Sequence, residues 1–201
     1  HAFALGILQT YDNDKVMDFI KTNYIQLVWY EHNDKYSGHE LNFNINFFKY
    51  WDNFEREYIS NNLLAKNNVN IIKYMENAII ENKYLYLCLD EFYIPDRWAY
   101  NNTHFYHDVL VYGFDSERNL FYLCGYDENM KFNFSECSYT NMIEASPEHI
   151  ELLSINKDYN YKINYDIMKY NIDGFINCND FQEFNSKFHN DERIYGFAAI
   201  Y

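Results

Sequence analysis

Hydrophobic residues follow a helical spacing in some stretches of this chain and a strand-like alternation in others. Apolar residues recur every three or four positions at 13–24 and 67–83, and a short apolar stretch opens the chain at 1–8. These three stretches predict helices. The second would begin at an N-cap formed by Asn13 or Asp14. The side chains expected to face inward are Val16, Phe19, Ile20, Ile71, Met75, Ala78 and Ile79.

Alternation with a period of two, or a short continuous apolar run, predicts the strands. The run at 84–94 is nearly all apolar, so we expect it at the centre of a sheet. The runs at 107–114 and 120–126 flank "DSERN", a polar stretch typical of a hairpin turn. Further strands are predicted at 24–31, 39–51, 131–137 and 149–155, and helices at 138–145 and from about 162 onward.

Helices therefore come first, then a block of antiparallel strands, then a helix, an order that favours an α+β fold over repeated βαβ units. The chain has 201 residues, of which 48% are hydrophobic, enough to bury a substantial core. We expect a single domain over 1–201, with the start of a further helical segment at 162–201 as the alternative.

Acidic residues outnumber basic ones by 30 to 16, which gives a formal net charge of −14. Nucleic acids and anionic membranes are bound by patches of Lys and Arg, and no basic run appears, so we expect neither partner. An acidic protein partner would need a local basic patch. The sequence offers Arg97, or Lys73 together with Lys83, for such a patch.

The four cysteines are far apart and form no Cys-x-x-Cys motif, which argues against a zinc knuckle. Cys88 and Cys124 lie inside apolar runs, which is typical of inert core thiols. No apolar run approaches the ~20 residues of a membrane span. These features predict a protein of the reducing cytoplasm. Aromatic residues make up 21% of the chain, and an apolar patch left exposed by them would allow a homodimer.

His107 opens the predicted strand at 107–114, and Asp127 follows the strand after the hairpin. Antiparallel strands joined by a hairpin bring the start of the first beside the end of the second, so the two side chains are within reach. A carboxylate beside a histidine fixes its tautomer and stabilises the imidazolium, as in catalytic dyads. The alternative is a strand-end histidine beside an exposed turn aspartate, and the spacing alone favours that alternative.

His104 and His107 have the three-residue spacing of an HxxH metal motif. On a strand this spacing places the two side chains on opposite faces, and no third ligand is evident, so we expect no metal site. Asp90 and Glu91 are adjacent acids at the end of the apolar strand. One of them would pair with Arg97 or line a cleft. The alternative is a solvated strand end with an ion pair.

The segments "KYLYLCLDEFYIPDR" and "HFYHDVLVYGFDSERNLFYLCGYDENMKFNFSECSYTNMIEA" resemble the papain-like N-terminal domain of the butirosin biosynthesis protein H family. Members of that family are found around nonribosomal peptide and other thiotemplate clusters. The resemblance rests on "LDEFYIPDR", on a histidine before the strand ending "YGFD", and on the later aspartate. It is best over 84–146, weaker at both ends and vague between 31 and 66. The order of elements also resembles bacteriocin-processing cysteine peptidases.

The resemblance implies a papain-like, cysteine-peptidase-like α+β fold, with N-terminal helices packed on a mostly antiparallel sheet. It also implies a Cys-His-Asp acyl or peptidyl transferase of nonribosomal-peptide-type biosynthesis. The acyl group would be a thioester on the phosphopantetheine of a carrier protein, and an amine would accept it. No further cofactor is expected.

In the resembled family the nucleophilic cysteine stands in a "HC…AL" start of the first helix. This chain begins "HAFALGIL", so Ala2 occupies the position expected for that cysteine. His107 matches the family's base and Asp127 its carboxylate. The residues then expected to bind substrate are His1, Asp90, Arg97 and His104.

Three explanations of Ala2 are open. The chain is a catalytically inactive member of the family that serves as a binding or assembly module, or it is an engineered Cys→Ala form. In the third explanation the nucleophile lies upstream or is another cysteine. Without a thiolate, His107 has no thiol to activate, and a covalent step on cysteine at position 2 is unavailable.

Overall fold

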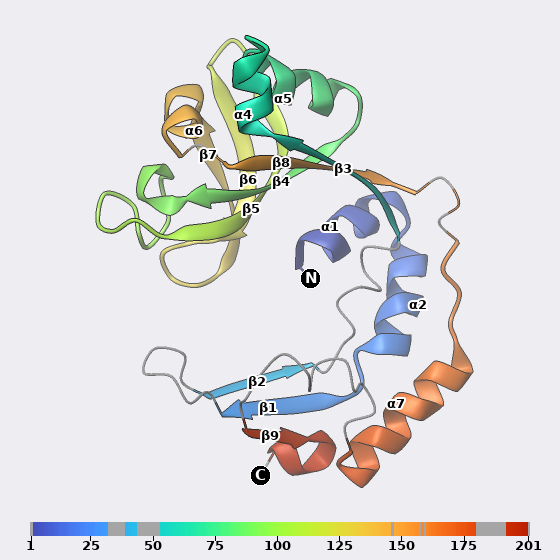
Figure 1. Cartoon of the computed structure of the whole chain (residues 1–201). Helices are drawn as coiled ribbons and strands as arrows, with labels where there is room; N and C mark the ends of the chain where they lie inside the picture. The colour runs from blue at the N-terminus through green and yellow to red at the C-terminus, as the bar shows by residue number, and fades with distance from the viewer. Residues whose placement is uncertain are drawn as a thin grey trace. The chain divides into compact units, whose positions relative to one another are not determined.

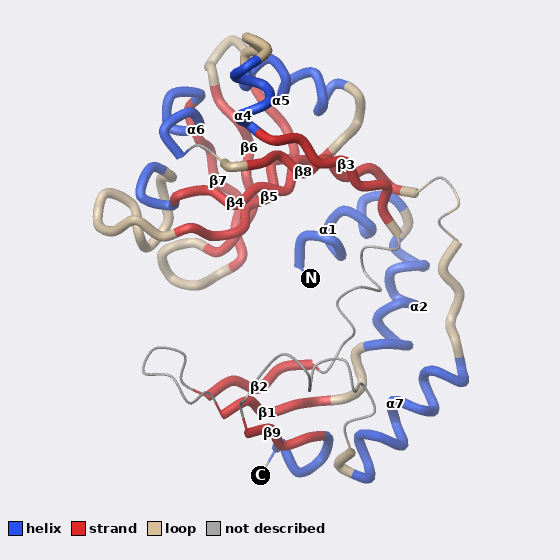
Figure 2. Tube along the Cα trace, in the orientation of Figure 1, coloured by secondary structure: helices blue, strands red, loops and turns tan. Residues whose placement is uncertain are grey.

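The computed structural model describes residues 2–31, 39–43, 53–145, 147–156, 158, 160–179 and 192–200 (Figures 1 and 2). The chain forms two compact units. One comprises His1–Asn53 with Lys157–Tyr201, and the other comprises Phe54–Asn156. Each unit has its own antiparallel sheet.

The first unit joins the two ends of the chain. Its elements are α1 (Ala2–Tyr11), α2 (Asn13–Asn23), β1 (Leu27–Glu31), β2 (His39–Phe43), α7 (Tyr165–Asn177), β9 (Glu192–Tyr195) and the 3₁₀ helix η3 (Gly196–Ile200). The helices predicted at both ends are confirmed. The predicted N-cap of α2 is wrong by one or two positions, because Asp12 is extended and its side chain accepts a hydrogen bond from the backbone N–H of Lys15.

Strand β1 lies in the middle of the three-stranded sheet, between β2 and β9. The predicted strand at 39–51 is confirmed for His39–Phe43, and its remainder from 44 to 51 lies outside the described residues. β9 was not predicted as a strand. Its register sets Ile194 opposite Trp29, so the apolar end of the chain pairs with β1.

Buried polar side chains join α2 to α7, which lie side by side (Figure 1). The Asn171 amide donates to the backbone carbonyl of Thr22 at 2.8 Å. The Asn23 amide donates to the carbonyl of Phe19 and to the Tyr161 hydroxyl, both at 2.9 Å. These bonds satisfy groups that would otherwise be buried without partners.

The second unit contains a six-stranded sheet of order β3-β8-β4-β5-β6-β7, in which every described pair is antiparallel. Its strands are β3 (Phe54–Ser60), β4 (Tyr84–Asp90), β5 (Tyr106–Asp115), β6 (Leu120–Tyr126), β7 (Phe132–Ser138) and β8 (His149–Ile155). Its helices are α4 (Asn61–Lys66), α5 (Ile71–Ile80), α6 (Tyr139–Ala145) and the 3₁₀ helix η1 (Glu91–Tyr93). An α+β fold with an antiparallel sheet and helices is therefore confirmed, and β4 is central as predicted.

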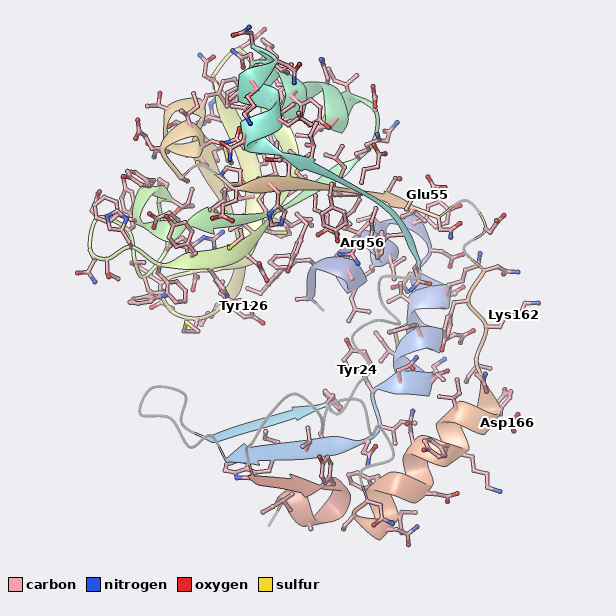
Figure 3. The ribbon with its side chains drawn as sticks, in the orientation of Figure 1. Tyr24, Glu55, Arg56, Tyr126, Lys162 and Asp166 are labelled. Atoms are coloured by element: carbon pink, nitrogen blue, oxygen red, sulfur yellow. The ribbon has the colours of Figure 1, made fainter. Side chains whose placement is uncertain are left out.

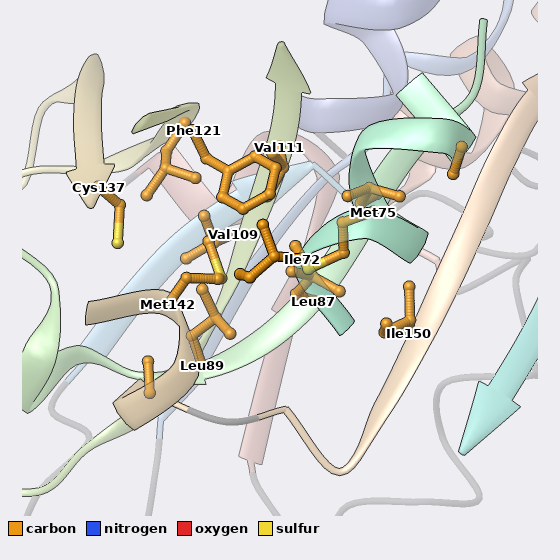
Figure 4. Close-up of a cluster of buried hydrophobic side chains, with 14 of the residues drawn as sticks. Ile72, Met75, Leu87, Leu89, Val109, Val111, Phe121, Cys137, Met142 and Ile150 are labelled. Atoms are coloured by element: carbon orange, nitrogen blue, oxygen red, sulfur yellow. The ribbon is translucent and has the colours of Figure 1, made fainter. Parts of the chain in front are cut away.

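Alternate residues of β4 separate the two faces of this sheet. Leu85, Leu87 and Leu89 are buried in the hydrophobic core, whereas Tyr86 and Cys88 on the other face are partly exposed. The core lies between the sheet and helices α4, α5 and α6 (Figure 4). It includes Ile72, Met75, Val109, Val111, Phe121, Met142 and Ile150. One face of the sheet therefore packs on the apolar core, and the other face mixes aromatic and ionisable side chains.

Strand β3 and helix α4 were missed by the hydrophobic pattern. β3 is an edge strand, and most of its "FEREYIS" side chains are exposed or partly exposed. An edge strand with few buried positions shows little apolar periodicity in its sequence. β3 is held in the sheet by its pairing with β8, which the sequence pattern does not reveal.

We predict that Leu87→Ala lowers the free energy of unfolding by about 2–5 kcal/mol, because it leaves a cavity in the centre of the core. Leu87 is 1% exposed. The matched control is Leu63→Ala in α4, where the side chain is 53% exposed, and we expect a change below about 1 kcal/mol. Urea unfolding measures both values. Equal losses at the two positions would contradict this description of the core.

Candidate functional site

Two adjacent acids at the end of β4 each contact one histidine, His104 in the loop before β5 and His107 near the start of β5. Asp90 Oδ2 lies 2.6 Å from His104 Nδ1, and Glu91 Oε1 lies 3.1 Å from His107 Nδ1. Both carboxylates are buried. The structure thus makes two histidine–carboxylate pairs from four residues that the sequence had singled out.

The pairing follows from the sheet register. β4 and β5 are antiparallel, and Leu89 lies opposite His107. The chain leaves β4 immediately afterwards and turns into η1, which begins at Glu91. Because successive residues point to opposite sides, Asp90 and Glu91 reach different histidines. The backbone N–H of Glu91 also donates to the carbonyl of Phe105 at 2.8 Å, which fixes this corner.

The His107 imidazole lies at the rim of the core face, with its side chain 37% exposed, while that of Glu91 is 2% exposed. The carboxylate accepts the hydrogen bond, so Nδ1 carries the proton and Nε2 is left as the basic nitrogen. The bond to Glu91 raises the pKa of His107, with a further contribution from Asp108. Partial burial and the charge of Arg97 act in the opposite direction. A general base needs one ring nitrogen held by a carboxylate and the other left basic, and the pair of His107 and Glu91 would meet that requirement.

Asp90 is held more firmly than Glu91. Its Oδ1 accepts from the backbone N–H groups of Phe92 and Phe105, in addition to the bond between Oδ2 and His104. Burial disfavours the ionised form of Asp90, but these bonds outweigh it and lower the pKa of the carboxyl group. The ring of His104 stacks on Phe92, with centroids 4.6 Å apart. Asp90 and His104 therefore tie the loop after η1 back to the end of β4.

The predicted pairing of His107 with Asp127 is wrong in this structure. Asp127 Oδ1 accepts from the N–H groups of Asn129 and Lys131, both at 2.9 Å. The hydrogen bonds that Asp127 accepts in this turn lower its pKa, and the bond from the backbone N–H of Lys131 contributes most. The hairpin does bring Asp127 to the same end of the sheet. Its short side chain is satisfied by the turn that it begins, and Glu91 takes the imidazole instead.

Arg97 is buried, with 2% of its surface exposed. Its guanidinium donates to the carbonyl of Tyr126 and to the hydroxyl of Ser135. A Cβ at Gly125 would lie 3.0 Å from Arg97 Nη2, so a larger residue there would crowd the guanidinium. Burial lowers the pKa of Arg97, and the negative charge of Glu91 opposes that shift. Within the described residues, Arg97 Nε and Glu91 Oε2 are buried without a hydrogen-bond partner.

The basic patches expected for an acidic partner are not formed as predicted. Arg97 is buried, Lys83 lies 2.7 Å from Glu57, and Lys73 lies 2.5 Å from Glu76. These charges are used within the protein.

Arg97 and Asp127 instead line one pocket of about 180 Å³ in the second unit. The other described residues around it are Asp96, Glu128, Asn129, Asn133, Phe134 and Ser135. Of the residues expected to bind substrate, the structure groups Asp90 with His104, and it places Arg97 in a pocket that Asp127, the expected catalytic carboxylate, also lines. His1 lies outside the described residues, and Ala2 is the first residue of α1 in the first unit.

The four cysteines all lie in the described part of the chain and are free thiols. Burial raises the pKa of Cys124 to about 11 and that of Cys137 to about 12. Cys88 lines a pocket of about 290 Å³ with Tyr106, Glu148 and His149. Its pKa is raised by burial and by the charges of Asp108 and Glu148. Cys88, Cys124 and Cys137 are therefore poor nucleophiles at neutral pH. Cys124 is a buried thiol as predicted, whereas Cys88 is partly exposed on the face of β4 opposite to the core.

Among the described residues, no group of three or more His, Cys, Asp or Glu side chains is arranged to hold a metal ion. The described helices include none with the length and apolar character needed to cross a membrane. Neither a scan against protein-family models nor a search of the curated proteins found a match for this sequence.

Glu91 is the residue of the candidate site that the sequence did not identify as the partner of His107. The signal was present as two adjacent acids followed by two histidines three residues apart. It could be used only with the register of β4 against β5, because that register decides which acid meets which histidine.

We predict that Glu91→Gln lowers the pKa of His107, because the variant removes the carboxylate whose hydrogen bond raises it. Titration of the His107 imidazole by NMR measures the effect. Asp127→Asn is the matched control, and we expect the pKa of His107 to stay at the parent value. A shift in the control as large as in Glu91→Gln would restore Asp127 as the partner.

The same bond predicts a pH dependence of stability. A histidine with a raised pKa in the folded state stabilises the protein fully below its unfolded pKa of about 6.5. This contribution is lost as the pH rises through the folded pKa of His107. The difference in unfolding free energy between the parent and Glu91→Gln should therefore be larger at pH about 5.5 than at about 8.5. For Asp127→Asn, urea unfolding should give the same loss of unfolding free energy at both pH values. The pKa of Asp127 is lowered in the folded state, so its contribution to stability is fully present at any pH above its unfolded pKa.

Proposed function

We propose that this chain is a papain-like acyl or peptidyl transferase in which His107, held by Glu91, is the base. The observation that carries the proposal is the hydrogen bond between His107 Nδ1 and the buried carboxylate, which leaves Nε2 basic at a partly exposed position. An apolar helix at the start of the chain, an antiparallel sheet and a histidine near the start of a strand support the papain-like fold.

The proposed substrates are an acyl or peptidyl thioester on the phosphopantetheine of a carrier protein, and an amine. The amine nitrogen attacks the thioester carbonyl, the C–S bond breaks, and the thiol leaves. His107 Nε2 takes the proton from the attacking nitrogen and returns it to the departing sulfur, so no oxidant or further cofactor is consumed. Glu91 stabilises the imidazolium formed in between.

Ala2 shapes this mechanism. The position that the resemblance gives to the nucleophilic cysteine has no thiol, so this chain as it stands would transfer the acyl group directly to the amine. In the resembled family, a cysteine at this position adds an acyl-enzyme step. The proposal includes a cytoplasmic location, in keeping with four cysteines that are all free.

Ala2 also favours a second candidate function. A chain that keeps the fold but has no nucleophile would serve as a binding or assembly module of a biosynthetic cluster, recognising a carrier protein or peptide. In that case His107 and Glu91 would stabilise the corner of the sheet, and no rate would depend on His107.

We predict that Ala2→Cys gains a thiol that reacts with an acyl-N-acetylcysteamine thioester, a mimic of the carrier-bound substrate. The acyl group should appear on position 2 in preference to Cys178, which is exposed and reports the reactivity of an ordinary surface thiol. Mass spectrometry of tryptic peptides locates the acyl group.

For the parent chain, amide formation from the same thioester and an amine should require His107. Full turnover by His107→Ala would refute the transferase. If neither Ala2→Cys nor the parent reacts, while a carrier protein from the same cluster binds, the binding module is the function that stands.

A further inference from the structure

Five aromatic rings form a continuous row through His107. The centroids of Trp98 and Phe105 lie 5.2 Å apart, and those of Phe105 and His107 lie 5.6 Å apart. On the other side, His107 and Tyr126 are separated by 6.5 Å, and Tyr126 and Phe132 by 5.8 Å. We call these five residues the aromatic row. They come from the loop after η1, the start of β5, the end of β6 and the start of β7.

The row is exposed rather than buried in the core. Trp98 is 45% exposed, Phe105 38%, and Tyr126 and Phe132 40% each. Tyr126 lies at the last position of β6 (Figure 3). Exposed aromatic side chains that touch one another in series make a contiguous apolar surface, and such surfaces commonly mark binding sites. His107, whose Nε2 is the base of the proposed mechanism, is the central ring of the aromatic row.

The surroundings of the row are acidic. Acidic residues outnumber basic ones between 90 and 132. Asp96 and Asp127 are the sequence neighbours of Arg97 and Tyr126, and with Glu128 they line the 180 Å³ pocket. The positive charge of Arg97 is buried beneath this surface, which leaves Arg118 and Lys131 as the exposed bases in this stretch. Arg118 lies in the hairpin between β5 and β6 and is paired with Glu136. Aromatic faces and a negative field both favour a cationic ligand.

The spacing of the rings fits an extended chain. Successive rings are 5.2–6.5 Å apart, and two residues of an extended peptide span about 6.6 Å. A compact ligand would reach two or three rings, whereas an extended peptide of about six to eight residues would follow the whole row.

We propose that the aromatic row binds an extended peptide with basic side chains, and that the bond to be formed or transferred lies over His107. The placement over His107 rests on the proposed function, whereas the binding itself rests only on the rings and charges described above. Lysine or arginine side chains would lie on the ring faces, and the acids around the row would attract them.

Calorimetric titration with capped hexapeptides tests the proposal. The basic probe is acetyl-Lys-Ala-Lys-Ala-Lys-Ala-amide, and the acidic probe has Glu in place of each Lys. We expect the basic probe to bind at least about tenfold more tightly, with an affinity that falls as salt is raised. n-Butylamine, the third probe, should bind much more weakly than the basic hexapeptide, because it reaches one ring.

Phe105→Leu and Tyr126→Leu should each weaken binding of the basic probe about two- to fivefold, the usual contribution of one cation–π contact. Tyr58→Leu is the matched control, because Tyr58 is 57% exposed on β3 and its ring contact, with His149, lies outside the row. The control should stay within about twofold of the parent. Circular dichroism checks that each variant is folded.

Equal affinities for the basic and acidic probes, or no binding of either, would overturn the proposal. So would ring variants that behave like the control, or n-butylamine bound as tightly as the hexapeptide. Peptide binding without any acyl transfer would refute the transferase and leave the peptide surface standing. Acyl transfer with no preference for the basic peptide would refute the peptide surface and leave the transferase standing.

Discussion

Two adjacent carboxylates, Asp90 and Glu91, are buried where β4 ends, and much of the structure around His107 serves to compensate them. A buried carboxylate is costly unless it is paired and hydrogen-bonded. Asp90 receives two backbone N–H groups and His104, and Glu91 receives His107. Because both acids need these partners at once, the loop after η1 and the start of β5 are held in one arrangement.

Arg97 extends this compensation beneath the surface. Its guanidinium interacts electrostatically with Glu91 and fits against Gly125, where a Cβ would lie only 3.0 Å from Nη2. Burying an arginine here has a second effect, since it removes a positive charge from the surface around His107. The exposed side is then left to aromatic rings and acids, which is the character that we interpret as a surface for a basic peptide.

Ala2 and His107 bear on different parts of the proposed function. The bond between His107 and Glu91 is a property of the second unit alone, and in the proposed function it fixes the tautomer of the base. Ala2 belongs to the first unit, and it decides which chemistry such a base would serve. An enzyme that transfers directly to an amine and a module that only binds both keep the corner of the sheet, and they differ in whether the proton on nitrogen needs His107.

The hydrophobic pattern by itself determined the central strand, the hairpin of β5 and β6, the helices α1, α2, α5, α6 and α7, and the α+β class. Each of these elements buries one regular stripe or face, so its apolar residues recur in the sequence with the period of a helix or a strand. The edge strand β3 has few buried positions and needed its partner β8. Tertiary structure alone decided that His107 binds Glu91 instead of Asp127. The hairpin spacing correctly predicted that the start of β5 lies beside the end of β6. Whether Asp127 bonds to its own turn or to His107 depends on side-chain direction, and the spacing of residues in the sequence does not give that direction.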